Sequence, residues 1–252
     1  MTNATHGERR KVAVLGGGAW GTALAKLLAD KGDDVSLWCR REELADAINR
    51  TRVNERYLPG APLAATLSAT ADMPRALDGA GMIVFVAPSH ATRDVARAAA
   101  AHVANNALIV SATKGIENDS LDFIDQILAA ELPSHTHPRL AFLSGPSFAK
   151  ELAAGLPTAV VIAAKDSATC LDVQHRFHAP HLRTYASDDV VGVECGGALK
   201  NVIAIAAGAA DGLGFGHNTR AGLITRGLAE IARVSLARGG QASGRRFGVN
   251  LQ

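Results

Sequence analysis

Three glycines near the start of the chain constrain its fold more than any other feature. Gly16, Gly18 and Gly21 fit the pattern G-x-G-x-x-G. They follow an apolar run at residues 12–15, which predicts a buried strand, and precede residues 22–31, where apolar side chains recur at helical spacing. In a strand–turn–helix unit these glycines permit a tight turn, close approach of a pyrophosphate and close helix–strand packing. The pattern therefore predicts a dinucleotide-binding site, with an ordinary glycine-rich turn as the alternative.

The rest of the chain alternates strand-like and helix-like segments up to about residue 185, which is typical of a parallel sheet covered on both faces. We expect strands at residues 12–15, 35–38, 83–86, 108–111 and 140–143, and further edge strands at 158–163 and 182–185. We expect intervening helices at residues 42–49, 91–103 and 121–132. Two long helices, 188–214 and 218–238, follow without a strand between them.

The predicted fold class is therefore α/β. A Rossmann-like, mainly parallel sheet domain should span residues 1–187, and an all-helical domain should follow at residues 188–252. Because no Pro/Gly linker separates the two, we expect the first long helix to pack tightly against the sheet domain. Ligands of such folds bind beyond the carboxyl ends of the strands, often between domains.

Composition narrows the class of protein further. The chain has 252 residues, of which 48% are hydrophobic and 20% charged, and a net charge of +2. This is a globular composition without a basic stripe, so we expect no nucleic-acid partner. Cys39, Cys170 and Cys195 are far apart and form no C-x-x-C pair, which indicates packing residues in a reducing compartment and not a metal or disulfide site.

Hydropathy favours a cytoplasmic protein. The first ten residues are polar and lack the apolar core of a signal peptide. The longest segment nearly free of charge, residues 195–210, is shorter than the roughly 20 residues that span a bilayer, and it carries Lys200. We therefore expect no membrane span.

Two arginines follow the second predicted strand. An NAD-binding fold usually places Asp or Glu about 20 residues after the glycines, against the ribose 2′-hydroxyl. Here Arg40 and Arg41 occupy that position. Guanidinium groups suit a 2′-phosphate, so the pair favours NADP over NAD. The alternative is a solvated cationic helix start that Glu42 or Glu43 partly neutralises.

Lys200 is the most informative residue outside the glycine turn. Between residues 195 and 210 only Lys200 and Asn201 are polar. A lysine in such a helix either extends to solvent or is buried for a function, and burial lowers its pKa toward that of a general base. Gly196 and Gly197, within one turn of it, would let a ligand or a strand end approach the helix.

Two further segments follow predicted strands and could meet a ligand. Lys114 lies just past the strand at 108–111, where it meets a cofactor or an anionic substrate, or is a plain surface lysine. Gly145 and Ser147 follow the strand at 140–143, where Gly145 allows close approach. Ser147 either donates to a substrate oxygen or simply caps the next helix.

Several motifs in one order resemble the bacterial NAD(P)-dependent glycerol-3-phosphate dehydrogenases. The resemblance runs from about residue 11 to 238 and rests on residues 16–25, 114–117 (Lys-Gly-Ile-Glu), 144–149 (Ser-Gly-Pro-Ser-Phe-Ala), 199–204 (Leu-Lys-Asn-Val-Ile-Ala) and 218–227. It implies interconversion of sn-glycerol 3-phosphate and dihydroxyacetone phosphate with NAD or NADP, used mainly to supply glycerol 3-phosphate for phospholipid synthesis. The alternatives are a catalytically weak NADP-binding protein and a hydroxyacid or ketopantoate-type reductase.

The resemblance also implies roles for individual residues. It makes Lys200 the proton acceptor, with Asn201 orienting the reacting oxygen. It places three residues around the substrate: Lys114, Gly145 and Ser147. It places the cofactor against Gly16, Gly18, Ala19, Trp20, Gly21, Arg40, Arg41, Lys114 and Ala149. It needs no metal, and it allows for a homodimer.

The C-terminal segment departs from this resemblance. Typical members have a glycine-rich segment with an Asp and then a Ser-Arg-Asn signature that binds the substrate phosphate. Here Gly239 and Gly240 run directly into residues 241–248, which resemble only the downstream edge of that signature. Either the chain is shortened, or a segment of its C-terminal domain is missing from the sequence. Arg245 or Arg246 could substitute as the phosphate ligand.

Overall fold

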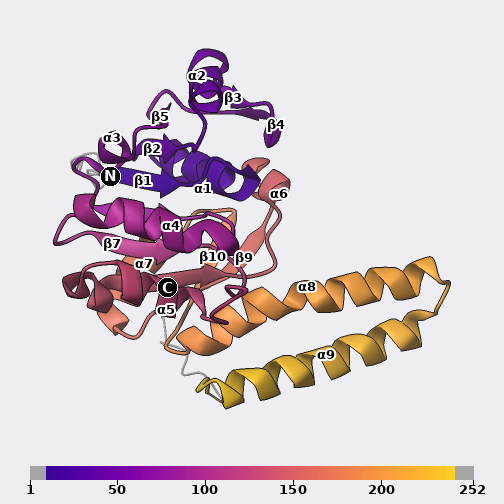
Figure 1. Ribbon diagram of the computed structural model, residues 1–252. Helices are drawn as coiled ribbons and strands as arrows, with labels where there is room; N and C mark the ends of the chain where they lie inside the picture. The colour runs from indigo at the N-terminus through magenta and orange to yellow at the C-terminus, as the bar shows by residue number, and fades with distance from the viewer. Residues whose placement is uncertain (1–9, 242–252) are drawn as a thin grey trace, which may run out of the picture.

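The computed structural model describes residues 10–241, and an eight-stranded sheet forms its centre (Figure 1). The strand order is β10-β9-β8-β7-β6-β1-β2-β5, and neighbouring strands are parallel except for the antiparallel pair β8 and β9. The strands are β1 (Lys11–Leu15), β2 (Asp34–Trp38), β5 (Leu67–Thr70), β6 (Met82–Phe85), β7 (Leu108–Ser111), β8 (Leu140–Ser144), β9 (Thr158–Ala163) and β10 (Leu182–Ser187). A separate ribbon pairs β3 (Val53–Asn54) with β4 (Leu58–Pro62). The α/β, mainly parallel fold predicted from the sequence is confirmed.

Helices cover both faces of the sheet, because successive side chains of a strand point to opposite faces. Val12 and Val14 of β1 belong to one core, and Ala13 and Leu15 belong to the other. The helices are α1 (Ala19–Asp30), α2 (Glu42–Thr51), α3 (Met73–Leu77), α4 (Ser89–Ala99), α5 (Ile124–Glu131), α6 (Ala149–Ala153) and α7 (Ser167–Phe177). Short 3₁₀ turns lie at Ala100–His102 and Ser134–Arg139. Helices α1, α6 and α7 pack into the first core, and α3, α4 and α5 pack into the second.

Some helix boundaries differ from those predicted. Helix α5 begins at Ile124 and not at residue 121, because Leu121 has a left-handed backbone (φ 57°) that an α-helix does not contain. The helix expected at residues 91–103 begins two residues earlier and ends as a 3₁₀ turn. Ser147 does not cap α6, since Phe148 holds the N-cap position.

The order of the strands creates a crevice. β1 pairs with β2 on one side and with β6 on the other, so the chain winds away from β1 in opposite directions. Ligands of open α/β sheets bind at such a switch point, beyond the carboxyl ends of the strands. The glycine turn at residues 16–18 lies directly after β1, at this edge.

Two long helices, α8 (Val190–Gly212) and α9 (His217–Ala237), form a hairpin that projects from the sheet (Figure 1). Asp189 caps α8 by accepting a hydrogen bond from the Gly192 amide at 2.8 Å. The expectation that α8 packs tightly against the sheet domain is confirmed only for the start of the helix. Its buried residues lie mostly in the first two turns, which contact β8, whereas the remainder pairs with α9. We call α8 and α9 together the helical arm.

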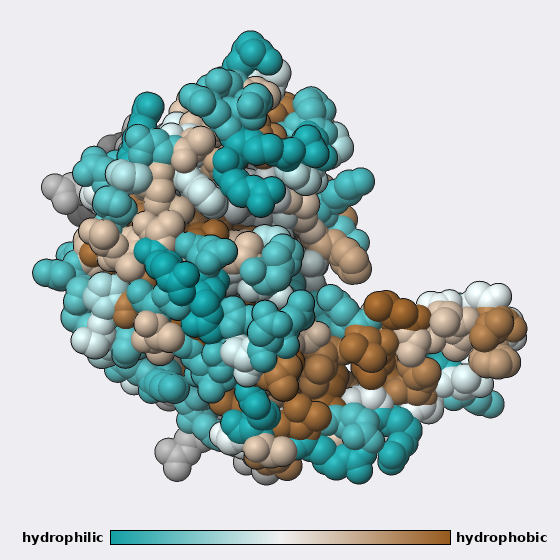
Figure 2. All heavy atoms as spheres, in the orientation of Figure 1, coloured by the Kyte–Doolittle hydropathy of each residue, from teal (hydrophilic) through white to brown (hydrophobic). Residues whose placement is uncertain are grey.

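The helical arm exposes much apolar surface, which Figure 2 shows as a brown face. In the two helices the most exposed large apolar side chains are Val202, Ile205 and Leu228, and Leu213 is exposed in the turn that joins the helices. By length and composition alone α8 is apolar enough to cross a membrane, with a mean hydropathy of 1.5 in its most apolar window. Core helices of globular proteins meet the same criterion, so this is weak evidence.

The three cysteines behave as packing residues. Cys39, Cys170 and Cys195 are free and buried. Burial raises the pKa of each thiol, and that of Cys39 rises to about 11. A thiol with a raised pKa stays protonated and is a poor nucleophile, as the sequence interpretation requires.

Candidate active site

The glycine turn joins β1 to α1 under tight steric limits. Gly16 has a φ of 140°, and a Cβ there would lie 2.8 Å from the carbonyl oxygen of Val86. A Cβ on Gly21 would collide with the carbonyl oxygen of Gly16. At Gly18, in contrast, a Cβ would meet no atom within 4 Å. Gly16 and Gly21 therefore allow close packing of the strand, the turn and the helix, whereas Gly18 borders open space.

A groove of about 540 Å³ lies in front of this turn. Its walls come from the start of α1, the end of β2, the segments after β6 and β7, and the start of α4. The predicted site residues that line it are Gly16, Gly18, Ala19, Trp20, Gly21, Arg40, Arg41, Lys114 and Ser147. Its volume lies within the range of small-molecule and cofactor sites.

Arg40 and Arg41 form one wall of the groove where β2 ends. Arg40 is exposed, and Arg41 donates a hydrogen bond from Nη2 to the hydroxyl of Tyr57 at 2.8 Å. Tyr57 also lines the groove. The sequence analysis missed Tyr57, because it lies beside the β3–β4 ribbon, whose short strands carry no clear alternation.

Trp20 and Lys114 meet on the other side of the groove. The Nζ atom of Lys114 lies 5.2 Å from the centre of the Trp20 ring. The indole Nε1 of Trp20 is buried and has no hydrogen-bond partner among the described residues. Buried indole N–H groups are normally paired, so this donor is an exception among the described residues.

Lys114, which lines the groove, interacts with Lys200 of α8, which lies behind the groove wall and does not line it, so the two form a pair of amines. Nζ of Lys200 donates to the carbonyl oxygen of Gly145 at 2.8 Å, and Nζ of Lys114 lies 3.4 Å from Oγ of Ser147. Burial and then the charge of Lys200 lower the pKa of Lys114 to about 8. Burial also lowers the pKa of Lys200. The structure thus brings Lys114, Gly145, Ser147 and Lys200 together.

Close packing of α8 against β8 makes this meeting possible. A Cβ on Gly197 would lie 2.6 Å from Oγ of Ser144, so only glycine fits there without a shift of its neighbour. Gly196, which the sequence also singled out, faces open space. Gly145 has a φ of 158°, and a Cβ there would lie 2.9 Å from the carbonyl oxygen of Ala159.

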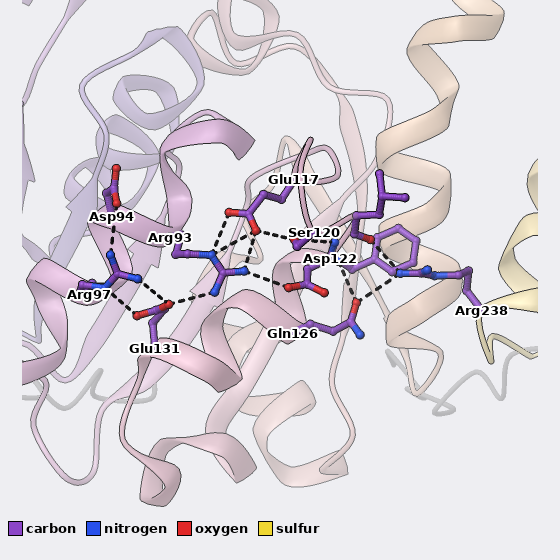
Figure 3. A network of polar contacts seen from close by, with 11 residues as sticks. Arg93, Asp94, Arg97, Glu117, Ser120, Asp122, Gln126, Glu131 and Arg238 are labelled. Atoms are coloured by element: carbon purple, nitrogen blue, oxygen red, sulfur yellow. Dashed lines mark hydrogen bonds and ion pairs between the residues drawn. The ribbon is translucent and has the colours of Figure 1, made fainter.

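A network of ion pairs holds the segment that carries Lys114 (Figure 3). Arg93 of α4 contacts Glu117 at 2.6 Å, Asp122 at 3.0 Å and Glu131 at 2.9 Å. From the end of α9, Arg238 donates to the carbonyl oxygen of Leu121 at 2.9 Å. The segment between β7 and α5 is therefore fixed from the sheet domain and from the helical arm. The sequence analysis missed this network, since its members are far apart in the chain.

The remaining predicted residues lie around this centre. Asn201 is exposed on α8, one residue after Lys200. Ala149, the first residue of α6, is partly buried against the sheet core. Neither lines the groove as the described residues define it. Arg245 and Arg246 lie outside the described residues.

Together, the sheet order, the glycine turn and the groove at the switch point define a Rossmann-type dinucleotide-binding protein, with an amine pair where a substrate would meet the dinucleotide. The description "NAD-dependent glycerol-3-phosphate dehydrogenase N-terminus" matches residues 11–170, and the corresponding C-terminus matches residues 189–248. The chain belongs to the NAD-dependent glycerol-3-phosphate dehydrogenase family.

Individual relatives agree. A glycerol-3-phosphate dehydrogenase [NAD(P)+] of Leptospira biflexa is 51% identical over 91% of this chain and 69% of its own length. The crystal structure of glycerol-3-phosphate dehydrogenase from Coxiella burnetii matches with a TM-score of 0.86 and 41% identity, over 92% of this chain and 70% of that one. A ketopantoate reductase from Ralstonia eutropha matches with a TM-score of 0.61 and 23% identity, which shows a common fold alone.

Proposed function

We propose that this protein is an NAD(P)-dependent oxidoreductase that interconverts sn-glycerol 3-phosphate and dihydroxyacetone phosphate. The observation that carries the proposal is the meeting of Lys200 with Lys114, a residue that lines the groove. Membership of the family adds the substrate class. In the cell we expect the reaction to supply glycerol 3-phosphate for phospholipid synthesis.

The groove fits a dinucleotide. Gly18 caps α1 without a side chain, which leaves N–H groups of the first turn available to a pyrophosphate. The open space at Gly18 and the side chain of Trp20 both border the groove that the dinucleotide would fill. Ala19, Trp20, Arg40, Arg41, Lys114 and Ala149 would hold it. When bound, the nicotinamide supplies the hydride that is exchanged with C2 of the substrate.

Lys200 is the proposed acid–base group. Its hydrogen bond to the carbonyl oxygen of Gly145 fixes the amine beside the Lys114 segment, and burial lowers its pKa. A neutral Lys200 amine accepts the proton of the C2 hydroxyl during oxidation. In the reverse direction the protonated amine gives that proton to the carbonyl oxygen.

The other residues of this centre orient the substrate. Lys114 is a cation with a lowered pKa, and it attracts an anionic substrate as long as it is protonated. Ser147 contributes a hydroxyl group, and Gly145 allows close approach of backbone and ligand. Asn201 would contact the reacting oxygen from its exposed position next to Lys200.

Arg40 and Arg41 lead us to propose NADP as the preferred cofactor. Both line the groove beyond the end of β2, and Tyr57 holds the guanidinium group of Arg41. A 2′-phosphate at this place would receive charge-assisted hydrogen bonds that a 2′-hydroxyl cannot match.

We further propose a division of the chain at residue 187. Residues 1–187 would bind the dinucleotide, and residues 188–252 would contribute Lys200 and Asn201. The exposed apolar face of the helical arm would be covered by protein in a homodimer, and the protein would act in the cytoplasm.

Initial rates with purified protein test the proposal. We expect NADPH oxidation that depends on dihydroxyacetone phosphate and yields sn-glycerol 3-phosphate. Ketopantoate, the substrate of a reductase with the same fold, should give no turnover. NADPH binding without turnover of dihydroxyacetone phosphate would instead support a catalytically weak NADP-binding protein.

A further inference from the structure

Glu194 is a buried carboxyl group in the second turn of α8. Glu194 is 9% exposed. Oε1 accepts a hydrogen bond from the amide of Asp125, in the first turn of α5, at 3.1 Å. Oε2 is buried and has no hydrogen-bond partner among the described residues. The carboxyl group therefore links α8 to the N-terminus of α5 with only half of its bonding capacity.

Glu194 also borders a small cavity of mixed polar and apolar lining. Glu194, Lys114, Ser144 and Gly197 all line it, and its volume is about 10 Å³. A space of this size holds about one water molecule. Because Glu194 and Lys114 line the same cavity, a change in the Glu194 side chain alters the packing of the segment that carries Lys114.

We propose that Glu194 is a positioning residue for Lys114, capping α5 through one oxygen and facing the cavity that Lys114 lines through the other. Lys114 lies in the segment between β7 and α5, which Arg93 holds through Glu117 on its outer side. Glu194 holds the start of α5, the helix that follows this segment, through the amide of Asp125. The role of Lys114 in binding substrate rests on the proposed function. The contacts of Glu194 with α5 and with the cavity do not depend on that function.

The charge state of Glu194 suits this task. Burial, together with the nearby negative charge of Asp125, raises the pKa of Glu194 well above its usual range. Lys165 lies 3.8 Å from the Asp125 carboxylate and 82% of its side chain is exposed, so it offsets that charge weakly. A raised pKa favours the protonated form of this carboxyl group, which forms no ion pair with Lys114.

Two substitutions of Glu194 test whether its hydrogen bond to the Asp125 amide positions Lys114. Glu194→Gln keeps the volume, the neutral charge and an oxygen that accepts from the Asp125 amide. Glu194→Ala removes the cap and opens the cavity to water. The matched control is Gln174→Leu in α7, which removes another buried polar side chain that is hydrogen-bonded to the backbone. Gln174 donates to the carbonyl oxygen of Thr184 at 2.8 Å.

The first readout is the pKa of Lys114, which needs no activity. Reductive ¹³C-methylation labels all seven lysines of the chain, and Lys114→Arg identifies the Lys114 resonance in an NMR titration. We expect a pKa near 8 in the wild type, as burial and Lys200 dictate. Glu194→Ala should raise it toward the usual value by at least about half a unit, because the amine gains water. Glu194→Gln and Gln174→Leu should leave it unchanged.

The second readout is kinetic. Glu194→Ala should raise the KM for dihydroxyacetone phosphate roughly tenfold, as expected for loss of one buried hydrogen bond, while the Kd for NADPH stays constant. If Glu194→Ala does not fold, Glu194→Asp, whose shorter side chain withdraws the oxygen from the Asp125 amide, should shift both readouts in the same direction.

The outcomes are distinct. An unchanged Lys114 pKa in Glu194→Ala or Glu194→Asp, or an equal shift in Gln174→Leu, would overturn the proposal. A wild type that does not reduce dihydroxyacetone phosphate would overturn the proposed function, while the NMR titration would still decide the role of Glu194.

Discussion

Replacing Gly18 by alanine should separate cofactor binding from folding. Gly18 has φ −77° and ψ −179°, which alanine adopts readily, and an added Cβ meets no atom within 4 Å. The cost in folding free energy should therefore be at most about 1 kcal/mol, from a poorer helix N-cap. The same Cβ enters the space into which a pyrophosphate would approach. We expect the Kd for NADPH to rise at least about tenfold, or 1.4 kcal/mol.

Gly16→Ala, in contrast to Gly18→Ala, should mainly lower the stability of the fold. The φ of 140° is strained for alanine, and the added Cβ would lie 2.8 Å from the Val86 carbonyl oxygen. Backbone strain of roughly 1–3 kcal/mol and overpacking of similar size together predict a loss of about 2–6 kcal/mol in the free energy of unfolding. The fold would be weakened before binding is tested.

Urea unfolding monitored by circular dichroism measures the free energy of unfolding of each variant. Titration calorimetry measures its Kd for NADPH. The control is Gly208→Ala, at an exposed helical position where a Cβ meets nothing within 4 Å. It should stabilise α8 by about 1 kcal/mol and leave the Kd unchanged. If Gly18→Ala binds NADPH as tightly as the wild type, the open space at Gly18 is not the pyrophosphate site and the reasoning is refuted.

Two further predictions concern charged groups. Replacing Arg40 and Arg41 together by alanine should weaken the binding of NADPH far more than that of NADH, by about 1.5–3 kcal/mol for each charge-assisted hydrogen bond. The control Arg50→Ala should weaken the binding of neither cofactor. Equal losses for both cofactors in calorimetry would contradict the assignment. The Arg93 guanidinium lowers the pKa of Glu117 to about 2, so this pair stabilises the fold above about pH 4.5 and loses its effect as the pH falls toward 2. Arg93→Leu should therefore destabilise the protein at pH 7 and flatten the decline of stability with acid, and an unchanged pH profile of urea unfolding would contradict this.

The strands could be predicted because each is a short apolar run buried on both faces. Periodicity located the sheet strands β1, β2 and β6 to β10 within a residue or two, and the shift at β6, from residues 83–86 to Met82–Phe85, is typical of such boundaries. It did not locate β5 or the β3–β4 ribbon, whose residues alternate weakly. It also extended α5 too far, since nothing local reveals the left-handed backbone at Leu121.

Prediction of the candidate site succeeded where one segment carries the signal. Gly16 to Gly21, and the lone Lys200 in an apolar helix, are visible in the sequence alone. Glu194 and Arg93 were missed, because their partners lie 69 and 24 residues away and only the fold brings them together. The sequence also did not reveal that most of α8 projects away from the sheet, since an apolar sequence of this kind is equally typical of a fully buried helix.

Steady-state and binding measurements on Lys200→Met test the central claim most directly. Methionine keeps the length and the apolar stem of the side chain but removes the amine, and Lys165→Met at an exposed lysine is the control. We predict that Lys200→Met lowers kcat for reduction of dihydroxyacetone phosphate by roughly 100-fold or more, the usual contribution of an acid–base group, with an unchanged Kd for NADPH. Near-normal turnover by Lys200→Met would contradict the account and leave Lys200 a structural residue of α8.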